Sequence, residues 1–223
     1  MTEDEIRAHQ RGVLTADEMA AHPERATLDA LRGDPRFPAL CATFQAGEGN
    51  LLEATEDDTA LQQIATIRWA IDAYAPALFS TAEVGFHKGF FYLLLCHLRP
   101  AAASLIDHYA CDIRPDSAKA AAILGARVHF TAGDSRLVWA NVLEEVGGCA
   151  NLAWIDGGHE GSILSHDLAM AMEYGARLIL VDDAEWLPKL AGVISDCCNV
   201  YGYTRVVPPT SQDRRGIAVL VRQ

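Results

Sequence analysis

The sequence predicts an α/β fold: a seven-stranded, mostly parallel sheet with helices on both faces, a C-terminal antiparallel hairpin and a helical segment in front of it. Three observations predict this fold. From residue 81 onward, short apolar runs alternate with stretches of helix length, which is typical of parallel strands joined by helices. The last two apolar runs are separated by a loop too short for a crossover helix, so they form a hairpin. Residues 1–56 differ from the rest because they are charged, alanine-rich and interrupted by prolines.

The N-terminal segment is expected to form short helices. Thr15-Ala16-Asp17-Glu18 has the side chains of a capping box, in which Thr15 and Glu18 satisfy the first backbone N–H groups of a helix. Pro23, Pro35, Pro38 and the Gly47-Glu48-Gly49 turn separate the helices that follow. Residues 57–74 carry apolar side chains near helical spacing and stop before Pro76, which predicts a longer helix leading into the main domain.

We therefore divide the chain into a helical segment, residues 1–56, and a main domain, residues 57–223. The helical segment is expected to act as a lid over the substrate pocket or as an oligomer interface. In the main domain, the parallel strands are expected at residues 81–84, 103–106, 127–130, 151–155 and 177–181. The hairpin is expected at residues 203–207 and 216–221, with the connecting loop at 208–215.

Composition limits the classes of partner. The formal net charge of −12 repels phosphate backbones, so a small molecule is a better substrate than a nucleic acid. The six cysteines have no C-x-x-C spacing and predict core thiols rather than a zinc site or a disulfide framework. The first residues are acidic where a signal peptide is basic, and the longest apolar run, residues 89–96, is too short to cross a bilayer. We expect a cytoplasmic protein with no membrane partner, able to form homo-oligomers.

The most informative stretch is Glu83-Val84-Gly85-Phe86-His87-Lys88-Gly89, where a short strand leads into a glycine turn and then into an apolar helix. Two glycines four residues apart let the backbone turn tightly and approach a ligand. The acid precedes the turn and no third glycine follows, unlike the G-x-G-x-x-G loop of dinucleotide enzymes.

The E-x-G-x-x-x-G spacing and the terminal hairpin resemble the S-adenosylmethionine-dependent methyltransferases with a Rossmann-like seven-strand sheet. The resemblance covers about three quarters of the chain. It implies S-adenosylmethionine as cofactor and methylation of a small-molecule acceptor, most simply at a hydroxyl group. The cofactor contacts that it implies are Glu83, Gly85, Phe86, His87, Gly89, Asp107, His108, Asp134, Ser135, Asp156 and Gly157.

Acids at successive strand ends are the basis of this assignment, because ligands of open α/β sheets gather beyond the carboxyl ends of the strands. In the family, the acid after the second strand takes the ribose hydroxyls. Asp107 is our preferred residue for this role, since residues 103–106 are uncharged, and Asp112 is the alternative. After the third strand, Asp134 in Gly133-Asp134-Ser135 matches the family's adenine contact, although it also suits a helix N-cap.

Three carboxylates follow the fourth and fifth strands: Asp156, Asp182 and Asp183. They match, position by position, the metal ligands of metal-dependent small-molecule O-methyltransferases of the catechol and macrocin types. Carboxylate oxygens suit Mg²⁺. The alternative is that Asp156 orients the cofactor and Asp182 caps the next helix. His159 stands where the catechol-type enzymes place a catalytic base, whereas Gly158 departs from the macrocin-type pattern.

Two other classes of function remain open. One is a nucleoside-cofactor oxidoreductase on a similar sheet, which the absence of a Tyr-x-x-x-Lys pair and the terminal hairpin disfavour. The other is a non-catalytic protein that binds the cofactor or a partner.

Overall fold

The structure, a computed structural model, describes residues 14–44, 57–184, 188–208 and 216–223. A seven-stranded sheet runs through its centre in the order β3-β2-β1-β4-β5-β7-β6. The first five strands are parallel, and β7 lies antiparallel between β5 and β6. The predicted fold class is thereby confirmed. The strands are β1 (Ser80–Val84), β2 (Asp107–Asp112), β3 (Val128–Ala132), β4 (Leu152–Ile155), β5 (Leu178–Val181), β6 (Tyr203–Val206) and β7 (Ala218–Arg222).

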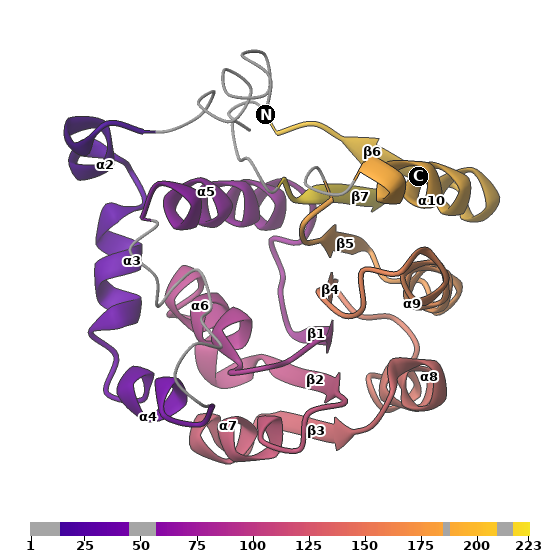
Figure 1. The fold of residues 1–223 in the computed structure, drawn as a ribbon, viewed down its shortest axis with the longest axis horizontal. Coiled ribbons are helices and arrows are strands. Elements are labelled where there is room, and N and C mark those ends of the chain that lie inside the picture. The colour runs from indigo at the N-terminus through magenta and orange to yellow at the C-terminus, as the bar shows by residue number, and fades with distance from the viewer. Residues whose placement is uncertain (1–13, 45–56, 185–187, 209–215) are drawn as a thin grey trace.

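Helices cover both faces of the sheet (Figure 1). One face packs against α5 (Asp57–Tyr74), α6 (Phe90–Leu98) and α7 (Ser117–Leu124). The other packs against α8 (Ser135–Glu145), α9 (Gly161–Glu173) and α10 (Pro188–Tyr201). β4 and β5 are buried along their whole length, because they lie in the middle of the sheet and consist almost entirely of apolar residues.

Three short helices lie outside α5 and α6: α2 (Ala16–Ala21), α3 (Arg25–Arg32) and α4 (Phe37–Cys41) (Figure 1). The capping box at Thr15 is confirmed, since its hydroxyl accepts from the Glu18 N–H and the Glu18 side chain accepts from the Thr15 N–H. The expected glycine turn at residues 47–49 lies outside the described residues.

The N-terminal helices share a hydrophobic core with the main domain. Leu28, Leu31 and Leu40 are fully buried in the same cluster as the apolar residues of α5 and α6. Arg25 and Arg32 both form ion pairs with Asp57, at 2.5 and 2.7 Å, where α5 begins. The proposed boundary at residue 56 therefore separates segments that pack closely, and the role of residues 1–56 as a lid or an oligomer interface stays a prediction.

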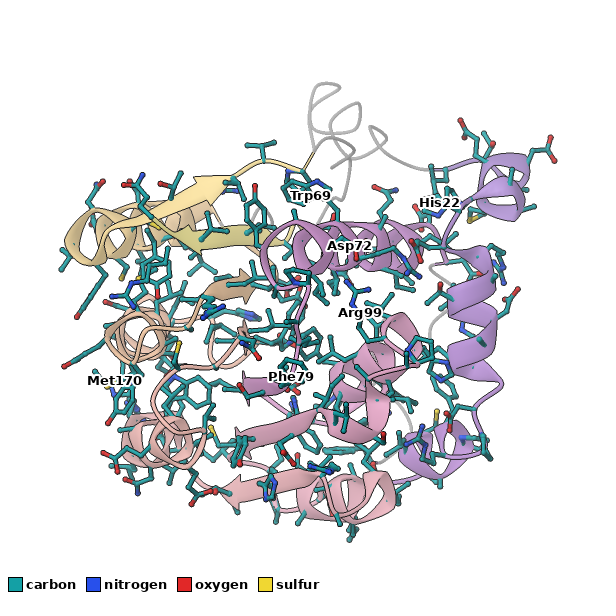
Figure 2. The ribbon with its side chains drawn as sticks, turned by 180° about the vertical axis from the view of Figure 1, so that it is seen from behind. His22, Trp69, Asp72, Phe79, Arg99 and Met170 are labelled. Carbon is teal, nitrogen blue, oxygen red and sulfur yellow. The ribbon has the colours of Figure 1, made fainter. Side chains whose placement is uncertain are left out.

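α5 is also fixed to the far end of α6. Asp72 near the end of α5 pairs with Arg99, which follows α6 (Figure 2). The helix expected at residues 57–74 is confirmed with the same limits. The expected hairpin is also confirmed, as β6 and β7, although residues 209–215 of its loop lie outside the described residues.

The expected position of the second strand is wrong. Residues 103–105 form a short 3-10 helix, η1 (Ala103–Leu105), and β2 begins at Asp107. Asp107 and His108 fit inside the strand because both side chains are satisfied there. Asp107 pairs with Arg127 at 2.9 Å, and His108 makes two buried hydrogen bonds. The other expected strands agree with the structure to within one or two residues at each end.

Candidate functional site

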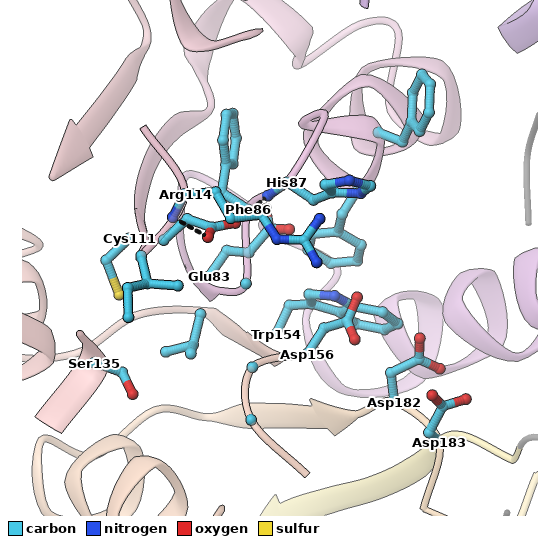
Figure 3. A pocket seen from close by; sticks show the side chains of 18 of the residues that line it. Glu83, Phe86, His87, Cys111, Arg114, Ser135, Trp154, Asp156, Asp182 and Asp183 are labelled. Carbon is cyan, nitrogen blue, oxygen red and sulfur yellow. Dashed lines mark hydrogen bonds between the residues drawn. The ribbon is translucent and has the colours of Figure 1, made fainter. Parts of the chain in front are cut away.

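A cavity of about 690 Å³ lies beyond the carboxyl ends of the parallel strands. Its floor is formed by residues that end or follow β1 to β5, and its walls come from α5 and α6. Figure 3 shows many of the side chains that line it. Since ligands of open α/β sheets bind at this edge, the cavity is the candidate functional site.

The turn after β1 requires glycine at both of its glycine positions. Gly85 has φ +88°, and a Cβ there would lie 2.0 Å from the carbonyl oxygen of Asp156. Gly89 has φ +70°, and its Cβ would lie 2.4 Å from a methyl carbon of Leu124. The Gly85 N–H donates to the Cys111 carbonyl at 3.0 Å. The turn therefore packs directly on the ends of β2 and β4, and its close approach to a ligand stays a prediction.

Asp112, rather than Asp107, is the acid at the carboxyl end of β2. Its carboxylate accepts from the His87 N–H at 2.6 Å and from the Arg114 N–H at 2.8 Å, and it lines the cavity. Asp107 lies at the opposite end of the strand, beside Arg127. The assignment of Asp107 to the cofactor is therefore wrong, because strand β2 starts where it was expected to end.

Glu83 lines the cavity and forms a buried hydrogen-bonded chain with His108 and Thr81. Glu83 Oε2 lies 2.7 Å from His108 Nε2, and Thr81 Oγ1 lies 2.7 Å from His108 Nδ1. His108 is fully buried behind the cavity wall with both ring nitrogens in use. It is therefore not available to a cofactor, and its expected contact is wrong.

The Glu83–His108 pair is best described as uncharged. Burial raises the pKa of Glu83 well above its usual value, and the nearby carboxylates of Asp156 and Asp112 raise it further. Burial, with a smaller effect of His129, lowers the pKa of His108 to about 3. Both shifts favour a protonated Glu83 that donates to a neutral His108.

Asp134 and Ser135 line the cavity at the start of α8. Asp134 is the N-cap of this helix and accepts from the Arg136 N–H at 3.0 Å. Hydrogen bonds from the Arg136 side chain and backbone lower the pKa of Asp134 to about 2, so it is ionised at neutral pH. The capping role and a place in the cavity therefore occur together.

Asp156, Asp182 and Asp183 lie at the tips of β4 and β5 (Figure 3). Burial raises the pKa of Asp156 well above its usual value, and the charges of Asp182 and Asp183 raise it further. Asp182 also accepts from the side-chain amide of Gln63 at 3.2 Å. The carboxylates are of the type that Mg²⁺ binds. Within the described residues, however, no three acidic, histidine or cysteine side chains form a preassembled metal cluster.

His159 lines the cavity next to these carboxylates. Its Nε2 lies 3.8 Å from Asp183 Oδ2 and 4.0 Å from Asp156 Oδ1, which is too long for a hydrogen bond. This nitrogen is buried and has no hydrogen-bond partner among the described residues. The structure thus brings His159 and all three predicted carboxylates into one cavity.

Sequence reasoning missed many of the lining residues, among them Trp154, Gln63 and Arg114. Trp154 stacks on Phe91 with ring centroids 4.4 Å apart, and it lies two residues before Asp156 on β4. Since alternate strand residues share a face, this spacing was a usable signal. Gln63 and Arg114 gave no signal, because their helix and loop reach the cavity only through tertiary packing.

Comparison with known proteins gives the class of the protein. Residues 82–184 match a family model described as a methyltransferase domain. This match and the seven-strand sheet with a terminal hairpin agree on one fold, that of S-adenosylmethionine-dependent methyltransferases. No curated protein matches the chain in sequence.

Several solved structures share this fold. The calicheamicin methyltransferase CalS11 is 16% identical, with a TM-score of 0.56 over 89% of this chain and 93% of that chain. Magnesium protoporphyrin IX methyltransferase (ChlM) from Synechocystis PCC 6803, with bound SAH, is 16% identical, with a TM-score of 0.52 over 88% of this chain and 100% of that chain. MycE from the mycinamycin pathway, in complex with Mg and SAH, is 14% identical, with a TM-score of 0.50 over 88% of this chain and 53% of that chain. Among the described helices of this protein, none has both the length and the apolar character needed to span a bilayer.

Proposed function

We propose that the protein transfers the methyl group of S-adenosylmethionine to a hydroxyl group of a small molecule. The observation that carries this proposal is one continuous cavity with two chemically different ends. The tips of β1, β2 and β3 provide the glycine turn with Asp112 and Asp134, and the tips of β4 and β5 provide His159 with its carboxylates.

The cofactor would occupy the first end. Asp112 is positioned by two backbone N–H groups, and its carboxylate can also accept from ribose hydroxyl groups. Glycine at positions 85 and 89 lets the ligand approach the backbone closely. Asp134 and Ser135 would contact the adenine.

The acceptor would occupy the other end, against Ile64 and Ile67 of α5. Its hydroxyl oxygen attacks the methyl carbon, the carbon–sulfur bond breaks, and the bonding electrons stay on sulfur, which leaves neutral S-adenosylhomocysteine. The hydroxyl proton passes to His159 Nε2, which has no competing hydrogen bond among the described residues. Holding the two reactants in line supplies the rest of the rate enhancement.

We also propose that Mg²⁺ assists the reaction, held by Asp156, Asp182 and Asp183. When bound, the ion would supply charge that lowers the pKa of an acceptor hydroxyl. The pKa of Asp156 is raised by burial and, to a smaller extent, by the charges of Asp182 and Asp183, and a bound cation would offset both effects, which supports this proposal. The carboxylates would have to draw closer together, because no described cluster is preassembled.

The comparisons support the proposal without carrying it. CalS11 is described as a TDP-rhamnose 3'-O-methyltransferase, and MycE is described in complex with Mg and SAH. At identities of 14–17% these likenesses establish only the fold. The net charge of −12 supports a small-molecule acceptor, and six free thiols support a reducing, cytoplasmic setting.

Calorimetric titration tests the cofactor assignment. S-adenosylhomocysteine should bind and NADH should not. Tight binding of NADH alone would instead favour an oxidoreductase. Methyl transfer from S-adenosylmethionine to a simple catechol then separates an enzyme from a protein that only binds the cofactor.

Chelation tests the metal. EDTA should abolish methylation of the catechol, and added Mg²⁺ should restore it. Asp182→Asn should remove the stimulation by Mg²⁺ with little change in S-adenosylhomocysteine affinity, whereas Asp196→Asn, an exposed acid on α10, should change neither. Activity that EDTA leaves unchanged would contradict the metal but not the cofactor or the fold.

A further inference from the structure

The N-terminal segment places an aromatic ring on the cofactor end of the cavity. Phe44 follows α4, and its ring centroid lies 4.2 Å from that of His87, at an interplanar angle of 61°. Lys88 Nζ lies 5.9 Å from the same ring centroid, and Arg114 Cζ lies 5.8 Å from it. Phe44 therefore contacts side chains from two loops, the glycine turn after β1 and the loop after β2.

The residues that Phe44 touches belong to the cavity. His87 and Arg114 both line it, and the backbone N–H groups of both donate to the carboxylate of Asp112. Any movement of these two residues would therefore move the acid that we assign to the ribose. His87 also has φ 46°, a left-handed conformation that costs free energy in a residue other than glycine. A contact on its ring helps to hold that conformation.

The helix that precedes Phe44, α4, is packed firmly against the rest of the protein. Leu40 is fully buried, and Phe37 stacks on Phe90 of α6 with ring centroids 4.9 Å apart. The Thr43 hydroxyl donates to the Leu40 carbonyl at 2.6 Å, which fixes the turn after α4. Phe44 is thus presented by a packed helix.

The phenyl ring of Phe44 can attract the positive charges of Lys88 and Arg114. The face of a phenyl ring is electron-rich, and a guanidinium or ammonium group within about 6 Å of the centroid is attracted to it. A leucine of similar volume would fill the space without offering this attraction.

We propose that Phe44 is a positioning residue for cofactor binding: by holding His87 and Arg114 around Asp112, it makes the N-terminal helices part of the cofactor site. The inference rests on the proposed S-adenosylmethionine chemistry and goes beyond it, because it assigns a role to a residue outside the methyltransferase domain. Phe44 touches neither cofactor nor acceptor in this role.

The test compares three variants by calorimetric titration with S-adenosylhomocysteine. Phe44→Leu and Phe44→Ala should each weaken binding about five- to thirtyfold, the range expected for the loss of both cation–π contacts, and Phe44→Tyr should retain most of the wild-type affinity. In steady-state assays the KM for S-adenosylmethionine should rise while kcat stays nearly constant. The melting temperature of ligand-free Phe44→Leu should remain close to that of the wild type.

Phe79→Leu is the matched control, because Phe79 is an exposed phenylalanine just before the start of β1 (Figure 2), whereas the cavity lies beyond the carboxyl end of that strand. It should bind S-adenosylhomocysteine like the wild type. Wild-type affinity in Phe44→Leu would overturn the proposal, and so would a weakened Phe44→Tyr. If the wild-type protein itself failed to bind S-adenosylhomocysteine, the proposed function would fall before the role of Phe44 was tested.

Discussion

At the scale of single residues, the hydrogen-bond partners of each polar side chain show whether it lines the cavity or stabilises the sheet. Asp112 and Asp107 belong to the same strand, yet Asp112 accepts two backbone hydrogen bonds at the cavity and Asp107 pairs with Arg127 at the far edge. His108 and Glu83 form one buried pair, although only Glu83 reaches the cavity. These assignments lead to two predictions.

The first compares two acids of β2. Asp112→Asn should weaken S-adenosylhomocysteine binding at least tenfold, because loss of a charge-assisted hydrogen bond costs roughly 1.5–3 kcal/mol. Asp107→Asn should leave affinity unchanged, since it removes only a partly exposed ion pair worth about 0–1 kcal/mol of stability. Calorimetric titration of both variants decides the matter. Equal affinities of the two variants would show that Asp112 has no part in binding.

The second prediction concerns how the stability contributed by the buried Glu83–His108 pair depends on pH. The folded-state pKa of His108, about 3, is below the usual 6.5, so the stability that neutral His108 contributes is present above pH 6.5 and is lost as pH falls toward 3. The wild type should have a higher free energy of unfolding than His108→Gln at pH 7. This difference should shrink by about 2 kcal/mol when the pH is lowered from 7 to 5, at about 1.4 kcal/mol per pH unit. The raised pKa of Glu83 has the opposite effect on stability. Above pH 4.5 the folded protein keeps a proton on Glu83 that the unfolded chain releases, so this contribution to stability falls as pH rises.

Urea denaturation of the two proteins at both pH values measures this change. Comparison with the variant cancels the titration of distant surface groups. An advantage that grows on acidification would mean that His108 is protonated in the folded state and forms an ion pair with Glu83.

At the scale of elements, the turn between β1 and α6 determines the shape of the cavity. It packs on the tips of β2 and β4 so closely that a side chain at Gly85 would overlap the backbone of Asp156. Gly147, in the loop before β4, has a similar φ of +87°, but a Cβ there would meet no atom within 4 Å. Both glycines therefore have a positive φ that disfavours other residues, but only Gly85 lies too close to neighbouring atoms to accept a side chain.

Alanine at these two positions separates the two effects. Gly147→Ala should cost only about 1–2 kcal/mol for the left-handed conformation. Gly85→Ala should cost more and should abolish S-adenosylhomocysteine binding, because the turn has to move away from β4. Thermal unfolding and titration measure both effects, and a Gly85→Ala protein that binds normally would contradict the packing of this turn.

At the scale of the whole molecule, the N-terminal helices share a hydrophobic core with the helices and strands that follow residue 56. Leu28 and Leu31 of α3 are fully buried against α5 and α6, and the ion pairs at Asp57 secure the same contact. We therefore expect one cooperative unfolding transition rather than separate transitions for residues 1–56 and 57–223.

Leu31→Ala should lower the free energy of unfolding by about 2–5 kcal/mol, the usual cost of a large cavity in a core. Leu137→Ala, at an exposed leucine on α8, should change it by no more than about 0.5 kcal/mol. Both are measured by urea denaturation followed by circular dichroism. A Leu31→Ala effect as small as that of Leu137→Ala would show that the N-terminal helices contribute little to the fold.

The sequence by itself determined the sheet and many of the polar residues that line the cavity, because both depend on local patterns. Alternating apolar runs place the strands, and a polar residue after each run is automatically carried to the same edge of a parallel sheet. Glu83, Asp134, Asp156, His159 and Asp182 were found in this way. The tertiary structure decided what depends on partners distant in sequence. Asp107 and His108 could enter a strand only because Arg127, Glu83 and Thr81 satisfy them, and Phe44 and Gln63 reach the site only through the packing of their helices. No local pattern encodes such pairings, since their free energy arises from contacts that exist only once the chain has folded.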